Sequence, residues 1–165
     1  MENVKDNRPF RPCVGIFLIN PEGKIFVGAR NDLSGNHWQM PQGGIDDGET
    51  PEIAAIREMK EEIGTAKAEI ILAHEHWIYY RLPSELSKIA WNGRFQGQKQ
   101  KWFALRFLGS DADIDIETDH PEFHAWKWAK LEQLPDMAVD FKRSAYEEVR
   151  SAFRDVVEMV KAESL

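Results

Sequence analysis

The segment from Gly43 to Thr65 constrains this chain more than any other stretch of its 165 residues. Thr50 followed by Pro51 is typical of a helix start, with a capping hydroxyl and a proline at the first helical position. Gly64 is the matching stop, because glycine readily adopts the left-handed conformation that ends helices. The sequence therefore predicts a helix between Thr50 and Gly64, preceded by a glycine-containing loop.

Three glutamates share one face of this predicted helix. With Glu58 set at zero and roughly 100° per residue, Glu61 falls at about 300° and Glu62 at about 40°. Met59 and Ile63 fall on the opposite side, so we expect them to be buried and the glutamates to face solvent. Like charges at this spacing repel each other, and a divalent cation would neutralise them. Carboxylate ligands on a rigid helix favour Mg²⁺ or Mn²⁺.

The bulk properties exclude several classes of protein. A hydrophobic content of 42% supports one core, so we expect a single domain over residues 1–165, with a flexible N-terminus over about residues 1–9. The sequence predicts no membrane span and no signal peptide, and Cys13 is the only cysteine, which favours a cytoplasmic location. A net charge of −7 argues against a protein that coats DNA or RNA, but permits one that grips a nucleic-acid end through a metal ion.

Strand-like and helical patterns alternate along the chain. Residues 20–23 predict a turn, residues 83–89 a short helical turn, and helical spacing of apolar residues predicts an amphipathic helix from about Lys142. The predicted strands are 13–20, 24–29, 68–81, 100–108 and 123–129. This order suits an α/β domain with a mixed sheet between helices.

Gly43, Glu49 and the run from Arg57 to Gly64 (REMKEEIG) have the spacing of the Nudix box, so the chain resembles the Nudix hydrolases. Seven fixed positions, each with a chance of about one in fifteen, match at random about 10⁻⁸ times per start point. Thr65 departs from the family's aliphatic residue, which we interpret as a packing variation. The resemblance implies a Nudix fold, an α/β/α sandwich with a mixed sheet in which the box forms loop, helix and loop.

The resemblance also implies roles for the residues of the box. The three glutamates and the Gly43 carbonyl would hold Mg²⁺, with Mn²⁺ or Zn²⁺ able to substitute, while Glu49 and Arg57 would pair and hold the loop. Water would attack a phosphorus, with Glu62 as the first choice of base and Glu122 as a further metal ligand or an alternative base. The implied catalytic and metal-binding side chains are Glu58, Glu61, Glu62 and Glu122.

Further segments resemble one subgroup, the bacterial RNA pyrophosphohydrolases, also described as dinucleoside polyphosphate hydrolases. These segments are Phe10–Gly15, Trp38–Gly44, Gly97–Phe103, Pro121–Phe123, Trp126–Trp128 and Val139–Arg143. In this reading Arg11, Lys99, Lys101 and Lys142 meet the triphosphate, and Phe141 stacks on the first base with Arg30 on its other face. Two alternatives stay open: the strand lysines are ordinary surface residues, or Phe141 is a core residue of the last helix. A short insertion around residues 33–35 adjoins Arg30.

The leading hypothesis is a Mg²⁺-dependent pyrophosphohydrolase that removes pyrophosphate from the 5′-triphosphate end of single-stranded RNA and so initiates RNA decay. The alternative is asymmetric cleavage of dinucleoside polyphosphates such as diadenosine tetra- or pentaphosphate, with release of ATP. A more distant alternative is a Nudix-like module that binds nucleotides without cutting them. We expect neither a membrane nor a DNA partner, and we allow for a weak homo-oligomer.

Overall fold

The computed structural model describes residues 5–31 and 37–164 of the chain, so the insertion expected around residues 33–35 lies outside the described residues. Within the described part, seven strands form one sheet with the path β4-β6-β1-β2-β7, while β3 pairs with β1 and β5 with β6. The strands are β1 (Phe10–Ile19), β2 (Ile25–Arg30), β3 (Gln42–Gly44), β4 (Ala68–Ala73), β5 (Ile78–Arg81), β6 (Gly97–Phe107) and β7 (Phe123–Ala129). The helices are α1 (Pro51–Ile63), α2 (Ser84–Ile89), α3 (Leu134–Met137) and α4 (Arg143–Glu163). Short 3₁₀ turns are η1 (Ala90–Gly93), η2 (Asp111–Asp113), η3 (Leu131–Gln133) and η4 (Asp140–Lys142).

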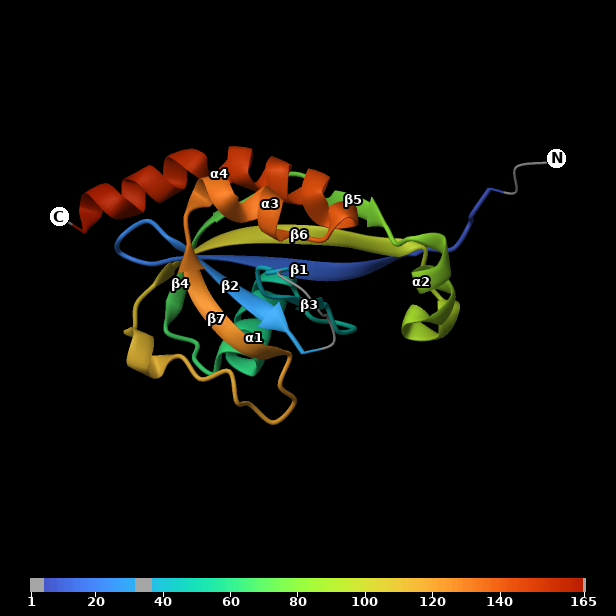
Figure 1. Cartoon of the computed structure of the whole chain (residues 1–165), viewed down its shortest axis with the longest axis horizontal. Coiled ribbons are helices and arrows are strands. Elements are labelled where there is room, and N and C mark those ends of the chain that lie inside the picture. Colours follow the sequence, from blue (N-terminus) through green and yellow to red (C-terminus); the bar gives the residue numbers. More distant parts are fainter. Residues whose placement is uncertain (1–4, 32–36, 165) are drawn as a thin grey trace.

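The sheet is mixed because β1 and β6 run parallel at its centre, whereas the other pairings are antiparallel. Alternate side chains of β1 enter two separate cores. Ile16 and Leu18 pack with α1 residues such as Met59, while Phe17 packs with α4 residues such as Phe153. Figure 1 shows α1 and α4 on opposite faces of the sheet. The α/β/α sandwich predicted from the sequence is therefore confirmed.

Local chemistry sets the ends of α1 as the sequence predicts. The Thr50 hydroxyl accepts a hydrogen bond from the Ile53 backbone at 3.2 Å, and Pro51 is the first helical residue. Gly64 ends the helix with φ 83°, and its N–H donates to the Lys60 carbonyl. A Cβ at Gly64 would also lie 2.4 Å from the Asp115 carbonyl oxygen. Both the handedness and the lack of space require glycine there.

The single strand predicted over residues 68–81 is wrong, because the structure divides it into β4 and β5. Both strands pair with β6, with Ala73 opposite Phe103 and Ile78 opposite Gln100. The five-residue advance from Ala73 to Ile78 therefore matches only a three-residue advance along β6. The extra residues leave the sheet, and the Lys101 ammonium donates to the His74 carbonyl at 2.6 Å.

The segment before β1 contacts the body of the protein through Arg8. Its guanidinium donates to the carbonyls of Ser87 and Gly93, both at 3.0 Å, and pairs with Asp6 at 2.7 Å. Residues 1–4 lie outside the described residues, so the flexible N-terminus stays a prediction there. Across residues 5–31 and 37–164, each helix is too short or too polar to cross a lipid bilayer.

Candidate active site

The two glycines of β3 bring the backbone against the glutamate face of α1. Antiparallel pairing places Gly43 opposite Val14 and Gly44 opposite Cys13. A Cβ added to Gly43 would lie 1.9 Å from the Glu58 carboxyl carbon, a distance that no side chain can occupy. A side chain at position 43 would therefore displace the Glu58 carboxyl, and one at position 44 would displace the Arg11 guanidinium.

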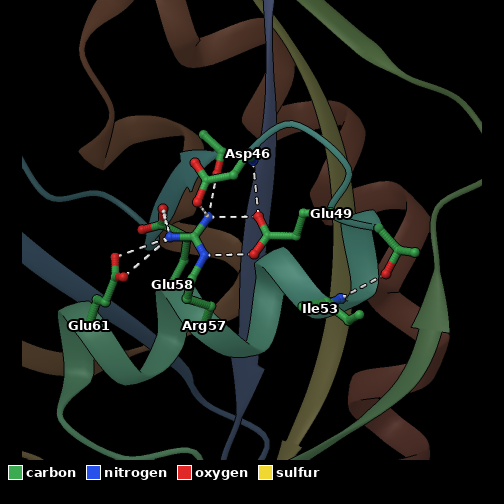
Figure 2. Close-up of polar contacts among 8 residues, drawn as sticks. Asp46, Glu49, Ile53, Arg57, Glu58 and Glu61 are labelled. Carbon is green, nitrogen blue, oxygen red and sulfur yellow. Dashed lines mark hydrogen bonds and ion pairs between the residues drawn. The ribbon is translucent and has the colours of Figure 1, made fainter.

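Arg57 joins the loop before α1 to the helix itself (Figure 2). Its guanidinium donates twice to Glu49, at 2.8 and 2.9 Å, and once to the Gly44 carbonyl at 2.8 Å. These hydrogen bonds from Arg57 lower the pKa of Glu49 to about 2. The remaining nitrogen donates to Glu58 at 2.9 Å and to Glu61 at 3.3 Å. The structure thus brings Glu49 and Arg57 together as expected, and adds contacts to two helical glutamates that the sequence reasoning missed.

Glu62 is buried and Glu58 half-buried, contrary to the expectation of a solvated face. Glu62 is only 7% exposed, and among the described residues its Oε2 has no hydrogen-bond partner. Burial raises the pKa of Glu58 to about 7, although Arg57 opposes the shift. Burial likewise raises the pKa of Glu62 well above its usual range, with added repulsion from Glu58 and Glu122. Glu61 alone is open, with a side chain 57% exposed.

These side chains fit a hard divalent cation by their chemistry. In the described part of the chain, no group of three or more His, Cys, Asp or Glu side chains has the spacing of a finished metal shell. Glu58 and Glu61 are instead turned toward Arg57. However, a buried carboxylate oxygen without a partner is costly unless something neutralises it. Several carboxylates around one such oxygen are the donor set that Mg²⁺ and Mn²⁺ prefer.

Two hollows meet at the glutamates, with volumes of about 330 and 630 Å³. The smaller one is also lined by Arg11, Arg30, Gln98 and Trp91. The larger one lies between α1 and the segment that contains Asp115, Thr118 and Glu122. All three helical glutamates and Glu122 line both hollows, so the structure brings together the four predicted catalytic carboxylates.

The predicted substrate-binding residues are distributed over three places. Arg11 and Arg30 reach the smaller hollow. Arg30 also lines a small neighbouring pocket with Lys142, which is buried and donates to Gln39 at 3.2 Å. Phe141 packs on Tyr80, with ring centroids 5.9 Å apart, and is not among the residues that line this pocket with Arg30. The stacking of Phe141 on a base stays a prediction.

Lys99 and Lys101 share a face of β6, as their spacing predicts, but the structure does not bring them to the glutamates. Gln98, the residue before Lys99, lines the smaller hollow. Since successive side chains of a strand point to opposite faces, the lysines lie on the other side of the sheet. Lys99 instead lies over the ring of Trp77, 5.2 Å from its centroid.

A buried ladder of glutamines behind the site was missed. Tyr80 donates to Gln98 at 2.7 Å, and Gln100 donates to Gln98 at 2.8 Å and to Gln42 at 3.0 Å. The three amides are thus hydrogen-bonded to one another, with Gln98 and Gln100 buried. The signal was present in the sequence as polar residues at alternate positions of a central strand.

Trp91 is the second feature that sequence reasoning missed. It and Asn92 have φ values of 50° and 58°, a conformation that side chains rarely adopt. The strained turn puts the Trp91 ring 5.1 Å from the Arg11 guanidinium, at the mouth of the smaller hollow. Asn92-Gly93 is a local turn signal, since both residues tolerate a positive φ, but nothing local predicts that Trp91 also adopts one.

Comparison with known proteins agrees with this geometry. The NUDIX domain family matches residues 9–149, and the chain belongs to this family, whose members generally use divalent metal ions. A Rhodospirillum rubrum protein named RNA pyrophosphohydrolase is 56% identical over 141 residues, covering 86% of this chain and 85% of that protein. A Wolbachia pipientis protein of the same name, from the strain of Culex pipiens, is 48% identical and covers 93% of this chain and 95% of that protein.

Solved structures share the fold at low sequence identity. The Escherichia coli dihydroneopterin triphosphate pyrophosphohydrolase superposes with a TM-score of 0.61 at 19% identity, over 86% of this chain and 97% of that one. A Caenorhabditis elegans Ap4A hydrolase gives 0.55 at 22% identity, over 92% of this chain and 98% of that one. These likenesses establish the Nudix fold alone.

Proposed function

We propose that this protein is a Mg²⁺-dependent hydrolase that removes pyrophosphate from the 5′-triphosphate end of RNA. The observation that carries the proposal is the carboxylate cluster around the buried, unpartnered Glu62 oxygen, in a chain 48–56% identical to proteins named RNA pyrophosphohydrolase. One water molecule is consumed and one P–O–P bond breaks. The products are a 5′-monophosphorylated RNA and pyrophosphate.

The residues that line the two hollows have different proposed roles. The three helical glutamates, with Glu122 beside them, would hold the divalent ion, which supplies neutralisation of the bridging phosphates and acidifies water. Mn²⁺ or Zn²⁺ would take the same oxygen ligands, and Mg²⁺ is proposed as the working ion. Arg11 and Arg30, which line the smaller hollow together with the glutamates, would bind the phosphate oxygens.

Glu62 is the proposed base that takes the proton of the attacking water. Burial raises the pKa of its carboxyl well above the usual range, and a base is most effective when its pKa is close to the working pH. Glu122 is the alternative base, since it is exposed and lines both hollows.

RNA and dinucleoside polyphosphates are distinguished by comparing kcat/KM for triphosphorylated RNA with kcat/KM for diadenosine tetra- and pentaphosphate, all with Mg²⁺. We expect RNA to be preferred. A preference of a hundredfold or more for the dinucleotides would refute the RNA assignment. Absence of hydrolysis on every substrate would favour a binding module, which the intact set of box glutamates argues against.

Glu61→Gln tests the proposed role of the glutamate cluster. Because Glu61 is 57% exposed, the substitution should leave the melting temperature nearly unchanged. We expect kcat to fall by about 10²–10⁴, as for a lost metal ligand. Glu158→Gln, an exposed glutamate on α4, is the matched control and should hydrolyse normally. Equal activity of both variants would contradict the metal-binding role.

A further inference from the structure

The side of the sheet opposite the glutamine ladder carries a row of aromatic and basic side chains that are exposed or half-buried. On β5, Ile78 and Tyr80 are buried, whereas Tyr79 is 57% exposed and Arg81 is exposed as well. Register places Tyr79 directly opposite Lys99 of β6. We define the aromatic–basic face by Phe10, Trp77, Tyr79, Arg81, Lys99 and Lys101.

Rings and cations alternate across this face and fix one another. The Lys99 ammonium lies 5.2 Å from the Trp77 ring centroid, and the Arg81 guanidinium lies 5.9 Å from that of Phe10. Phe10 in turn meets Tyr79 edge to face, with centroids 5.1 Å apart. The aromatic rings are therefore held in place, and they flank the cations rather than packing into a core.

The cations of the face lack acidic partners. Within residues 5–31 and 37–164, Arg81, Lys99 and Lys101 have no carboxylate within the 4.0 Å of an ion pair. Nearby acidic segments are engaged elsewhere: Asp6 pairs with Arg8 at 2.7 Å. Lys101 and Arg81 donate only to neutral oxygens, of His74 and Gln96, so their charges are not cancelled. In a chain of net charge −7, three cations without a carboxylate partner on one surface are complementary to a polyanion.

We propose that the aromatic–basic face binds single-stranded RNA downstream of the 5′ end, an inference that rests on the proposed function. Nucleobases stack on exposed aromatic rings with little regard for sequence, while basic side chains neutralise the phosphates between them. An apolar protein partner would instead bury the three cations without compensating charge. The face therefore fits a nucleic acid strand better than a hydrophobic surface.

The face is connected to the catalytic hollow through β6. Gln98 lines that hollow and Lys99, the next residue, belongs to the face, so the two surfaces lie back to back on one strand. Figure 1 shows β5 running beside β6 on the outside of the sheet, toward α2. An RNA whose 5′ end occupies the hollow would reach the aromatic–basic face by passing around the edge of the sheet at β5.

The test compares substrates that differ only in length. The substrates are a three-nucleotide and a fifteen-nucleotide 5′-triphosphorylated RNA with the same first bases, and diadenosine tetraphosphate. Tyr79→Ala/Lys99→Gln removes one ring and one cation of the face, and Leu108→Ala/Lys161→Gln is the control, since Leu108 is also 57% exposed. Melting curves establish that both variants are folded.

We expect wild type and control to prefer the long RNA by about tenfold in kcat/KM, through KM, as stacking of one base supplies. The Tyr79→Ala/Lys99→Gln variant should lose this preference and retain its activity on the short RNA and on the dinucleotide. A fifteen-nucleotide RNA with a 5′-hydroxyl, followed by fluorescence anisotropy, should bind this variant about tenfold more weakly. The slope of log K against log salt should also decrease by about 0.7, as expected for one lost phosphate contact.

Two outcomes overturn the inference: no advantage of the long RNA in the wild type, or an equal loss by the Tyr79→Ala/Lys99→Gln variant on all three substrates. Failure of the proposed function gives a different result. In that case the wild type leaves both triphosphorylated RNAs uncut, while the 5′-hydroxyl RNA still binds through the face.

Discussion

Replacing Glu58 with glutamine should stabilise the metal-free protein above neutral pH. Burial raises the pKa of Glu58 from 4.5 to about 7, a net result that already includes the favourable contact with Arg57. Well below pH 4.5 this carboxyl is protonated in both the folded and the unfolded state, so it does not lower the free energy of unfolding. As the pH rises toward 7 it ionises more readily in the unfolded state, and the free energy of unfolding falls. At about 1.36 kcal/mol per pH unit, the full cost is about 3 kcal/mol at pH 8. Glutamine carries no charge and avoids this cost.

The assay is urea unfolding in the presence of EDTA at pH 5 and pH 8. Glu58→Gln should exceed the wild type by up to about 3 kcal/mol at pH 8, and by much less at pH 5. Loss of the Glu58 charge also removes one cause of the raised pKa of Glu62. This second effect also stabilises the variant relative to the wild type. Glu158→Gln on α4 is the control and should show no such pH dependence. Added Mg²⁺ should stabilise the wild type more than Glu58→Gln, because ligand binding stabilises only the state that binds it.

A Glu58→Gln protein that is no more stable than the wild type at pH 8 would refute this reasoning. It would mean that the pairing of Glu58 with Arg57 at 2.9 Å outweighs the cost of burial. The carboxylate would then be part of a satisfied ion-pair network, and the argument that the cluster requires a divalent cation would fail with it.

The remaining predictions concern packing around the same site. Gly43→Ala places a Cβ 1.9 Å from the Glu58 carboxyl carbon, so kcat in steady-state assays should fall by about 10² or more. Tyr146→Phe removes the hydroxyl that accepts a buried backbone N–H at 2.8 Å, and urea unfolding should show a loss of about 1–3 kcal/mol. Trp91→Leu removes the ring beside Arg11, so KM for triphosphorylated RNA should rise about two- to thirtyfold with kcat nearly unchanged. An unchanged KM in Trp91→Leu would show that Arg11 is held in place by other contacts.

The parts of the structure that were predictable are those that local chemistry determines. Thr50, Pro51 and Gly64 specify the ends of α1 through a capping hydroxyl, a fixed φ and a left-handed turn, and each acts within a few residues. Most strands could also be predicted, because buried strands are rich in branched and aromatic residues. The division of residues 68–81 into β4 and β5 could not be predicted from the sequence, since it depends on the register of both strands against β6.

Burial of the glutamate face could not be predicted for the same reason. A helical wheel assigns Glu58 and Glu62 to one side of α1, but it does not say what covers that side. The cover is β3, which is held by pairing with β1, almost thirty residues earlier in the chain. The lysines of β6 show the same limit: their shared face was correct, and only the sheet decides that Gln98 faces the hollow instead.

The arrangement around Arg57 explains how the glutamates stay close together in the metal-free protein and why they would still bind a cation. Glu49 and the Gly44 carbonyl hold one side of the guanidinium, so the nitrogen that faces Glu58 and Glu61 is fixed in direction. In the metal-free protein this nitrogen offsets part of the repulsion among the glutamates, which explains how a helix can keep them together. It does not reach the unpartnered oxygen of Glu62, which lies deeper. The cluster is therefore incompletely neutralised by the protein alone, and the missing positive charge is located where the proposed cation and the phosphates of the substrate would meet.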